Sequence, residues 1–238
     1  MKIVITMAGR GQRFRDAGYN CPKYMIHALG KTLFHWSMLS LDDFFTDDFI
    51  FIARNEDEPV SFITEECKLI GINNFNIVLI DHTTDGQATT VLKAKEFIGD
   101  YDELMIYNID TFVKQHNILR NQIKGDGYIP GFYAEGDKWS FIKLDDKNKV
   151  IEIAEKKPIS TVATLGLYYF KSFADYYKYY IKTFQDGRNL VNGEKYIAEI
   201  YNIMLNDHKD VYGTVLPNSA VWGLGTPNDL NYFMDNYE

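Results

Sequence analysis

Two glycines and three cationic side chains lie close together near the beginning of the chain. An apolar segment leads into the run Met7-Ala8-Gly9-Arg10-Gly11-Gln12-Arg13-Phe14, and Lys23 follows shortly after it. Glycine lets the backbone approach a phosphate closely and turn its N–H groups toward it. Guanidinium groups bind phosphate oxygens in pairs, and a lysine adds a point charge. The segment therefore predicts a polyphosphate site, with a plain tight turn as the alternative interpretation.

The charge of the chain is unevenly distributed, which supports an anionic ligand at this place. Residues 1–31 contain six Lys or Arg and a single acid, Asp16, so their net charge is +5. The 238 residues together contain 25 Lys or Arg and 33 Asp or Glu, a net charge of −8, which leaves −13 for the rest. A basic beginning on an acidic chain favours a small anionic ligand and argues against nucleic acid. A solvated charged surface is the alternative.

Two common phosphate-binding motifs do not match this loop. A Walker loop has the pattern Gly-x-x-x-x-Gly-Lys-Ser/Thr, which is absent from this chain. A dinucleotide fingerprint requires a third glycine where this chain has Phe14, and a bulky residue there would block close packing of the helix. The loop therefore argues against a P-loop NTPase and against a nicotinamide-dependent enzyme.

An aspartate follows a short apolar run in the middle of the chain. Residues 104–107 form a predicted strand, and Asp110 lies just beyond its carboxyl end. Parallel sheets bind ligands at the carboxyl ends of their strands. Magnesium commonly takes one or two carboxylates together with substrate phosphates. Asp110 is therefore the predicted metal ligand, with a strand-ending turn as the alternative, while the five histidines show no metal-ligand spacing.

The elements that must position these residues alternate between apolar runs and helical patterns. Short, wholly apolar runs separated by helices predict a parallel sheet covered on both faces. The predicted strands are 3–7, 49–53, 76–80, 104–107, 128–134, 139–144, 150–154 and 164–170. The predicted helices are 33–45, 59–70, 88–98, 173–183, 193–205 and 228–237. We expect a single α/β domain over residues 1–238, with a mostly parallel mixed sheet flanked by helices.

The glycine loop resembles the signature of a known family. Residues 7–14, followed by Pro22-Lys23, are similar to the Ala-Gly-Gly-x-Gly-x-Arg-Leu and Pro-Lys elements of nucleotidyltransferases that act on phosphorylated sugars and alcohols. The resemblance implies a Rossmann-like, glycosyltransferase-A-like fold, with a nucleotide-binding half over 1–125 and an acceptor-binding half over 126–238. It implies that an acceptor phosphate attacks the α-phosphorus of a nucleoside triphosphate and that pyrophosphate leaves. Such a reaction depends on alignment and charge neutralisation.

The resemblance also assigns roles within the first half. Arg13 would neutralise the β- and γ-phosphates, Lys23 would approach the α-phosphate, and Asp110 would coordinate Mg²⁺, so these three are the predicted catalytic residues. Asp85-Gly86-Gln87 would bind the nucleobase, because Gly86 leaves room for it and Gln87 offers a donor and an acceptor. A helix cap by Asp85 is the alternative there. The backbone that would hold the triphosphate comprises Met7, Ala8, Gly9, Arg10, Gly11 and Gln12.

Further matches in the second half imply an acceptor site. Glu155-Lys156 resembles the family's Glu-Lys-Pro element, so Lys156 would bind the acceptor phosphate and Glu155 its hydroxyls; a charged turn is the alternative. Gly166 would leave room beneath the acceptor, and Glu194 would accept hydrogen bonds from hydroxyls. The chain departs from the pattern at Gly223-Leu224, a stretch where many members carry an aspartate as second metal ligand. This departure puts in doubt both the metal shell and any transfer of substrate identity.

These observations lead to an expected activity and compartment. We expect a Mg²⁺-dependent enzyme that transfers a nucleotidyl group, from CTP by preference, to a phosphorylated sugar or small alcohol for a surface polysaccharide. The chain has no stretch of 18 apolar residues and only two cysteines, which argues against a membrane protein and favours the cytoplasm. Residues 176–180 are rich in tyrosine, typical of a homo-oligomer interface or of a half-exposed helix. A glycosyltransferase using a nucleotide sugar and a non-catalytic nucleotide-binding domain stay open as alternatives.

Overall fold

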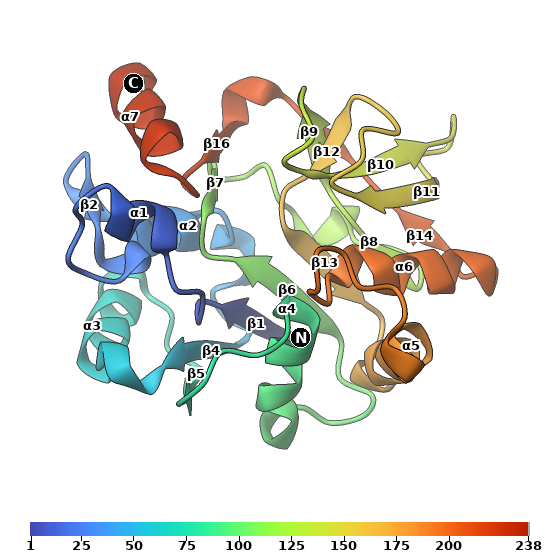
Figure 1. Ribbon diagram of the computed structural model, residues 1–238, viewed down its shortest axis with the longest axis horizontal. Coiled ribbons are helices and arrows are strands. Elements are labelled where there is room, and N and C mark those ends of the chain that lie inside the picture. Colours follow the sequence, from blue (N-terminus) through green and yellow to red (C-terminus); the bar gives the residue numbers. More distant parts are fainter. Residues whose placement is uncertain (238) are drawn as a thin grey trace.

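The computed structural model describes residues 1–237, and a seven-stranded sheet forms its centre (Figure 1). The strand order is β14-β8-β13-β6-β1-β4-β5, and the four strands from β6 to β5 are parallel. This arrangement confirms the predicted α/β fold with a mostly parallel mixed sheet. The strands are β1 (Lys2–Thr6), β4 (Asp48–Arg54), β5 (Phe75–Ile80), β6 (Leu104–Asn108), β8 (Gly127–Tyr128), β13 (Leu167–Phe170) and β14 (Val211–Tyr212).

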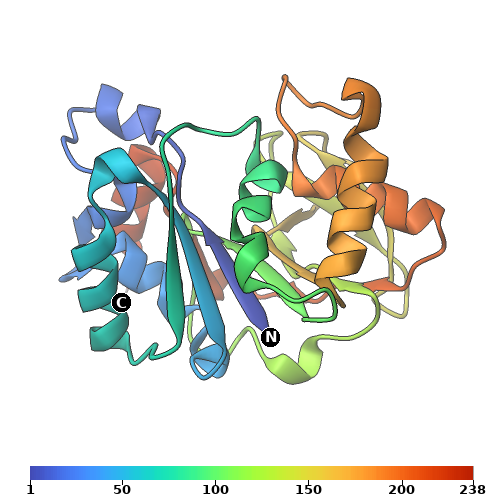
Figure 2. The same ribbon diagram turned by 90° about the horizontal axis from the view of Figure 1, so that it is seen from below.

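Helices cover both faces of this sheet, as Figure 2 shows. Ile3 and Ile5 of β1 share a hydrophobic core with α2 and α3, whereas Val4 between them shares a core with α4, α5 and α6. Successive side chains of a strand point to opposite faces, so a strand covered on both sides must be apolar throughout. The covering helices are α2 (Leu33–Leu39), α3 (Val60–Ile70), α4 (Gln87–Val91), α5 (Phe173–Phe184) and α6 (Ile197–Asn206).

A five-stranded sheet of order β11-β10-β12-β9-β15 lies beside the central one (Figure 1). Two strands that the sequence predicts as continuous are in fact divided between the two sheets. Residues 128–134 divide around Pro130, which has no N–H to donate, and residues 164–170 divide at Gly166, whose φ is +76°. The strands are β9 (Gly131–Tyr133), β10 (Ser140–Leu144), β11 (Val150–Glu155), β12 (Val162–Thr164) and β15 (Val215–Leu216).

The remaining elements pack around a smaller aromatic core beneath the glycine loop. Phe14 of α1, Trp36 of α2, Phe112 of β7 and Phe233 of α7 belong to this core. It joins the beginning of the chain to its end. The elements are α1 (Gln12–Asp16), α7 (Pro227–Asn236), β2 (His27–Ala28), β3 (Lys31–Thr32), β7 (Thr111–Val113) and β16 (Val221–Gly223).

Several predicted helices are shorter in the structure because their ends tighten or unwind. The helix predicted over 33–45 ends at Leu39, and the one predicted over 193–205 begins only at Ile197, after a loop in which Asn189 and Asn192 have positive φ. The helix predicted over 88–98 changes to 3₁₀ geometry after Val91. The 3₁₀ helices are η1 (Lys23–Met25), η2 (Asp42–Phe44), η3 (Asn55–Asp57), η4 (Leu92–Phe97), η5 (Arg120–Gln122), η6 (Gln185–Gly187) and η7 (Asn218–Ala220).

Two further observations bear on the sequence-based expectations. Within residues 1–237, none of the helices has the length and apolar character needed to cross a membrane. Cys21 is exposed, Cys67 is buried, and both are free thiols. In the tyrosine-rich stretch, Tyr176, Tyr179 and Tyr180 are buried against the core. That part of the stretch therefore packs inside the chain itself.

We predict that Tyr176→Phe lowers the free energy of unfolding by about 1 to 2 kcal/mol. The Tyr176 hydroxyl is fully buried and donates to the Ala88 carbonyl oxygen at 2.5 Å, so its removal deletes a buried hydrogen bond between α5 and α4. Urea denaturation measures the change. Tyr177→Phe, at a half-exposed neighbour on the same helix, should shift stability by less than about 0.5 kcal/mol. Equal effects of the two substitutions would contradict this account.

Candidate active site

The glycine loop joins β1 to the short helix α1 at the carboxyl edge of the central sheet. Gly11 has φ +61° and begins the helix, and its carbonyl accepts hydrogen bonds from the N–H groups of Phe14 and Arg15 at 3.0 and 3.2 Å. Phe14, the residue that breaks the dinucleotide fingerprint, is buried against Tyr19 in the aromatic core. The bulky side chain therefore anchors the loop from below and leaves the phosphate-facing side open.

Lys23 and Asp110 form an ion pair at the centre of the site. Lys23 Nζ donates to Asp110 Oδ2 at 3.0 Å, although 87 positions separate the two residues in the sequence. Lys23 begins η1, and Asp110 follows the end of β6. A Cβ on Gly225 would lie 3.4 Å from Asp110 Oδ2, so the loop before α7 closes against the carboxylate. The predicted α-phosphate ligand and the predicted metal ligand are thus brought into direct contact.

A cavity of about 660 Å³ lies in front of the glycine loop and next to this ion pair. Of the predicted nucleotide-binding residues, Met7 is buried beneath the loop and Asp85 stays outside the lining. Glu194, predicted for the acceptor, lines this cavity instead. The predicted residues that line it are Ala8, Gly9, Arg10, Gly11, Gln12, Lys23, Gly86, Gln87, Asp110 and Glu194.

The segment before α4 links the two halves of the chain. Lys195 N donates to the Asp85 carbonyl at 2.8 Å, and Ala88 N donates to the Lys195 carbonyl at 3.1 Å. Gly86 lies between these bonds with φ +138°, and a Cβ there would come within 2.5 Å of the Lys195 backbone. The close approach of these two segments therefore requires a glycine at position 86, independently of the predicted contact with a nucleobase.

Asp85 acts at this junction through charge. Its carboxylate receives Lys195 Nζ at 2.7 Å and the Thr89 hydroxyl. Partial burial disfavours the charged carboxylate, but the Lys195 ammonium and the Thr89 hydroxyl outweigh it and lower the pKa of Asp85. Helix α4 begins at the N-cap Gly86 without a side-chain cap hydrogen bond, so the alternative of a helix cap by Asp85 is wrong, and Asp85 pairs with side chains at this junction instead.

A second cavity of about 370 Å³ opens on the other side of the ion pair. It is lined by Arg13, which therefore lies at this second cavity and not at the first. Lys156 lies at its edge with φ +52°, an unusual conformation for a residue other than glycine, which is often found where function fixes a side chain. The predicted residues that line this cavity are Arg13, Gln87, Asp110, Glu155, Lys156 and Gly166.

Glu155 and Lys156 have different surroundings within this cavity. Lys156 Nζ donates to the Tyr196 hydroxyl at 2.6 Å and lies 4.5 Å from the centre of its ring. Glu155 accepts a hydrogen bond from the Ser140 hydroxyl. Burial raises the pKa of Glu155, an effect that the Ser140 hydroxyl and the Lys156 ammonium only partly oppose. The cavity thus offers one fixed cation and one poorly solvated carboxylate.

Several residues of the two cavities have no role in the sequence analysis. Asn108, the last residue of β6, lines both cavities, and Ser140, Trp139 and Tyr196 line the second. Asn108 stands two positions before Asp110, at the carboxyl end of the same strand, which is the one signal that could have pointed to it. Nothing in the spacing of the other three brings them toward Asp110, since Trp139 and Ser140 lie at the start of β10 and Tyr196 directly precedes α6.

The donor set around Asp110 fits a magnesium ion held mainly by substrate oxygens. Within residues 1–237, no three His, Cys, Asp or Glu side chains come close enough together to hold a metal by themselves. Asp229 lines the second cavity, but its carboxylate is bound to Lys138 Nζ at 3.0 Å and to the Thr226 hydroxyl. Gly223 offers no side chain where the family pattern has an aspartate. Magnesium suits such a place because it accepts one carboxylate together with phosphates and water.

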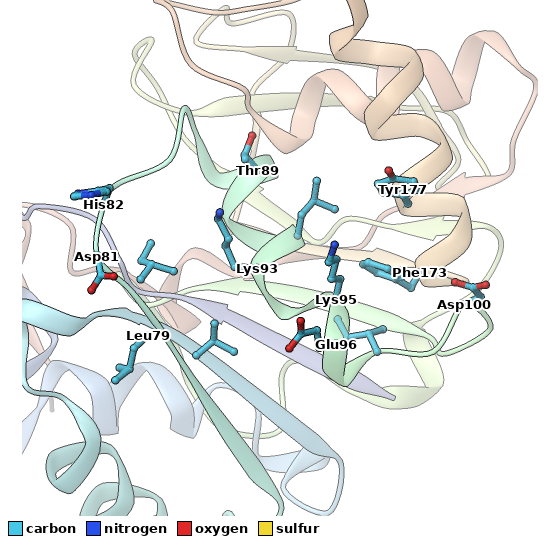
Figure 3. Close-up of a pocket in the computed structure, with 14 residues that line it drawn as sticks. Leu79, Asp81, His82, Thr89, Lys93, Lys95, Glu96, Asp100, Phe173 and Tyr177 are labelled. Atoms are coloured by element: carbon cyan, nitrogen blue, oxygen red, sulfur yellow. The ribbon is translucent and has the colours of Figure 1, made fainter.

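A larger hollow than these two cavities lies elsewhere (Figure 3). Its volume is about 1060 Å³, and it extends from β5 across η4 to α5. Leu79, Phe173 and Tyr177 contribute apolar surface, while Lys93 and Lys95 alternate with acids such as Glu96. None of the predicted site residues lines it. The two smaller cavities on either side of the Lys23–Asp110 pair are therefore the candidate active site.

Comparisons with known proteins show the family of this chain. A family model described as nucleotidyl transferase matches residues 2–238. A solved nucleoside-diphosphate-sugar pyrophosphorylase from Vibrio cholerae RC9 is 34% identical, with a TM-score of 0.91, over 98% of this chain and 100% of that one. A Bacillus anthracis structure assigned as a glucose-1-phosphate thymidylyltransferase shares the fold, with a TM-score of 0.77. It is 20% identical, and the match covers 100% of this chain and 96% of that one.

A curated relative matches over a shorter stretch. The bifunctional protein GlmU of Methanocaldococcus jannaschii is 24% identical over 181 residues, which is 71% of this chain. The match covers 40% of the length of that relative.

We predict that Glu155→Gln changes how stability depends on pH. Because burial raises the pKa of Glu155, the folded protein binds this proton more tightly than the unfolded chain does. Stability from this group is fully present below the ordinary pKa of about 4.5 and is lost as the pH rises through the raised pKa. The free energy of unfolding of the variant, measured relative to the wild type, should therefore increase with pH above about 4.5. Glu152→Gln, an exposed position of the same strand, should leave the pH dependence unchanged; a flat difference for Glu155→Gln would contradict the burial argument.

Proposed function

We propose that this chain, which belongs to the nucleotidyl transferase family, transfers a nucleotidyl group from a nucleoside triphosphate to a phosphorylated sugar or small alcohol and releases pyrophosphate. The observation that carries the proposal is the Lys23–Asp110 pair, which lies between a cavity lined by the glycine loop and a cavity lined by Lys156. Two substrates that react through their phosphates must be aligned, and their negative charge must be neutralised by a cationic side chain or a metal ion held by a carboxylate.

The reaction is an in-line displacement at phosphorus. A non-bridging oxygen of the acceptor phosphate forms a bond to the α-phosphorus, and the bond from that phosphorus to the α,β-bridging oxygen breaks. The bridging oxygen leaves with the electron pair as part of pyrophosphate. Because both reactants are anions, the protein must hold them together against their repulsion, and oriented backbone N–H groups and cations serve that purpose.

The residues of the first cavity suit the triphosphate. The loop from Ala8 to Gln12 presents its backbone, and Lys23 stands where the α-phosphate would approach Asp110. In the free protein Asp110 is the counter-ion of Lys23. A bound phosphate would compete for the same ammonium, so substrate binding would release the carboxylate for a cation.

The residues of the second cavity suit the phosphate of an acceptor. Arg13 and Lys156 both line it, and Lys156 is fixed by the Tyr196 hydroxyl and ring. Arg13 therefore binds the acceptor phosphate in this proposal, and not the β- and γ-phosphates as the resemblance implies. Glu155, buried beside Ser140, would accept hydrogen bonds from acceptor hydroxyls.

Magnesium is proposed as the cofactor, held by Asp110 and substrate oxygens. When bound, the ion would supply neutralisation of the triphosphate charge. CTP is the first nucleotide to test, and the product would be a precursor of a surface polysaccharide. A cytoplasmic location and a homo-oligomer remain predictions of the sequence alone.

A direct assay tests the proposal. The protein is incubated with Mg²⁺, each of ATP, GTP, CTP, UTP and dTTP, and a panel of phosphorylated sugars and polyols, and pyrophosphate release is measured. We expect release that requires both substrates. Release of a nucleoside diphosphate from a nucleotide sugar would support the glycosyltransferase alternative, and nucleotide binding without turnover would support a non-catalytic domain.

We predict that Lys23→Ala and Asp110→Asn each lower kcat by about 100-fold or more, because each removes one charge of the central pair. Circular dichroism and the melting temperature should show that both variants remain folded, since both side chains are partly exposed. Lys182→Ala removes a matched lysine–aspartate pair on the surface, Lys182 with Asp207 at 2.6 Å, and should leave kcat within twofold. Near-normal turnover of either site variant would refute the role given to that residue.

A further inference from the structure

Asn108 occupies a special place between the two cavities. Among residues 1–237, only Gln87, Asn108 and Asp110 line both of them. Asp110 belongs to the charged centre, and the resemblance assigns Gln87 to the nucleobase. Asn108 is the one member of the three to which the reaction as described gives no task.

The carboxamide of Asn108 is held in a defined orientation. Its Oδ1 accepts a hydrogen bond from Gln87 Nε2, which also donates to the Thr6 hydroxyl at 2.9 Å. These bonds run across the carboxyl ends of the neighbouring strands β1 and β6, where Thr6 and Asn108 are partners in register. The acceptor atom of the amide is therefore used within the protein, and the amide cannot turn over without losing that bond.

The other end of the carboxamide points to the second cavity. A Cβ on Gly166 would lie 2.7 Å from Asn108 Cγ and nearer still to Nδ2, so the amide rests directly on the Gly166 backbone. Gly166 lines the second cavity and not the first. Within the described residues, Asn108 Nδ2 has no hydrogen-bond acceptor in the protein. The division of the strand at Gly166 thus creates the space that this amide fills, and it leaves N–H groups facing the acceptor.

The chemistry of a neutral amide differs from that of the cations nearby. Arg13 and Lys156 supply charge for a phosphate, whereas Asn108 lines the same cavity with an uncharged donor. With Arg13 and Lys156 in the same cavity to bind the phosphate, an uncharged N–H donor fixed at another point is left for a neutral oxygen of the acceptor, such as a hydroxyl or a ring oxygen. Thr164 and Tyr168, whose hydroxyls lie 3.3 Å apart, line the same cavity and are neutral as well.

We propose that Asn108 is the acceptor-selecting residue: Gln87 holds its carboxamide over Gly166 so that Nδ2 donates to an uncharged oxygen of the acceptor's organic part, while Arg13 and Lys156 bind the phosphate. This inference rests on the proposed function for the identity of the second cavity. The role of Asn108 also specifies the acceptor more closely: it is a phosphate ester that has an uncharged oxygen close to the ester carbon.

Binding of simple phosphates tests the assignment without turnover. Phosphorus NMR titrations measure the dissociation constants of inorganic phosphate, glucose 1-phosphate and glycerol 3-phosphate for the wild type, Asn108→Leu and Asn108→Asp. We expect the wild type to bind at least one of the two esters about tenfold more tightly than inorganic phosphate. Asn108→Leu should lose that preference while its affinity for inorganic phosphate stays within twofold. Asn108→Asp keeps an acceptor for Gln87 but loses the donor and adds a negative charge, so it should weaken all three.

A matched control and two contrary outcomes make the test decisive. Asn76→Asp, at an exposed position of β5, should change none of the constants by more than twofold. If the wild type prefers neither ester, or if Asn108→Leu keeps the preference, the assignment is overturned. The pyrophosphate assay with the wild type tests the transferase proposal separately. If the wild type is active and Asn108→Leu keeps the same acceptor preference, the transferase proposal stands and the role given to Asn108 is refuted.

Discussion

The site depends on the register of two parallel strands at the centre of the sheet. β1 and β6 lie side by side with Thr6 opposite Asn108, so the chain leaves both strands at the same edge and the same level. The glycine loop follows β1 and Asp110 follows β6. The cationic segment and the carboxylate therefore lie close together although most of the first half of the sequence separates them. Both strands are buried on both faces, so their side chains alternate between the two cores. A shift of register by one residue would move each side chain to the opposite core and would disrupt the packing of both.

Charge at this edge is balanced within the free protein. Asp110 is paired with Lys23, Asp85 with Lys195, and Asp229 with Lys138, each at 2.7 to 3.0 Å. Pairs that are partly exposed contribute little to stability. Lys23 lines the first cavity and Lys138 the second, so in the proposed reaction a phosphate would exchange for a carboxylate that these ammonium groups already hold.

The second half of the chain completes the site by leaving the central sheet and returning to it. Gly166 allows the chain to pass from β12 in the small sheet to β13 beside β6, and it makes room for the Asn108 amide at that crossing. The Lys195 backbone docks onto the segment around Gly86 from the other side. Two glycines with positive φ thus act at the contacts between the halves, because a side chain at either place would overlap the neighbouring segment.

The parallel strands, the glycine loop and the position of Asp110 at the end of its strand were all accessible from the sequence. Apolar runs of strand length and a loop with two glycines and three cations carry local signals that survive folding. The resemblance added Glu155 and Lys156 and assigned Lys23 to the α-phosphate, and the structure places all three residues at the two cavities.

Contacts between distant segments were decided only by the tertiary structure. The division of residues 164–170 between two sheets, the placement of Arg13 at the second cavity, and the position of Asn108 between Gln87 and Gly166 follow from such contacts. The physical reason is that the local sequence pattern determines which helix or strand a residue belongs to and which face its side chain occupies. The residues that this side chain contacts depend on how separate elements pack against one another. Phe14 illustrates both levels: its type excluded one motif from the sequence, but only packing against Tyr19 shows that it anchors the loop.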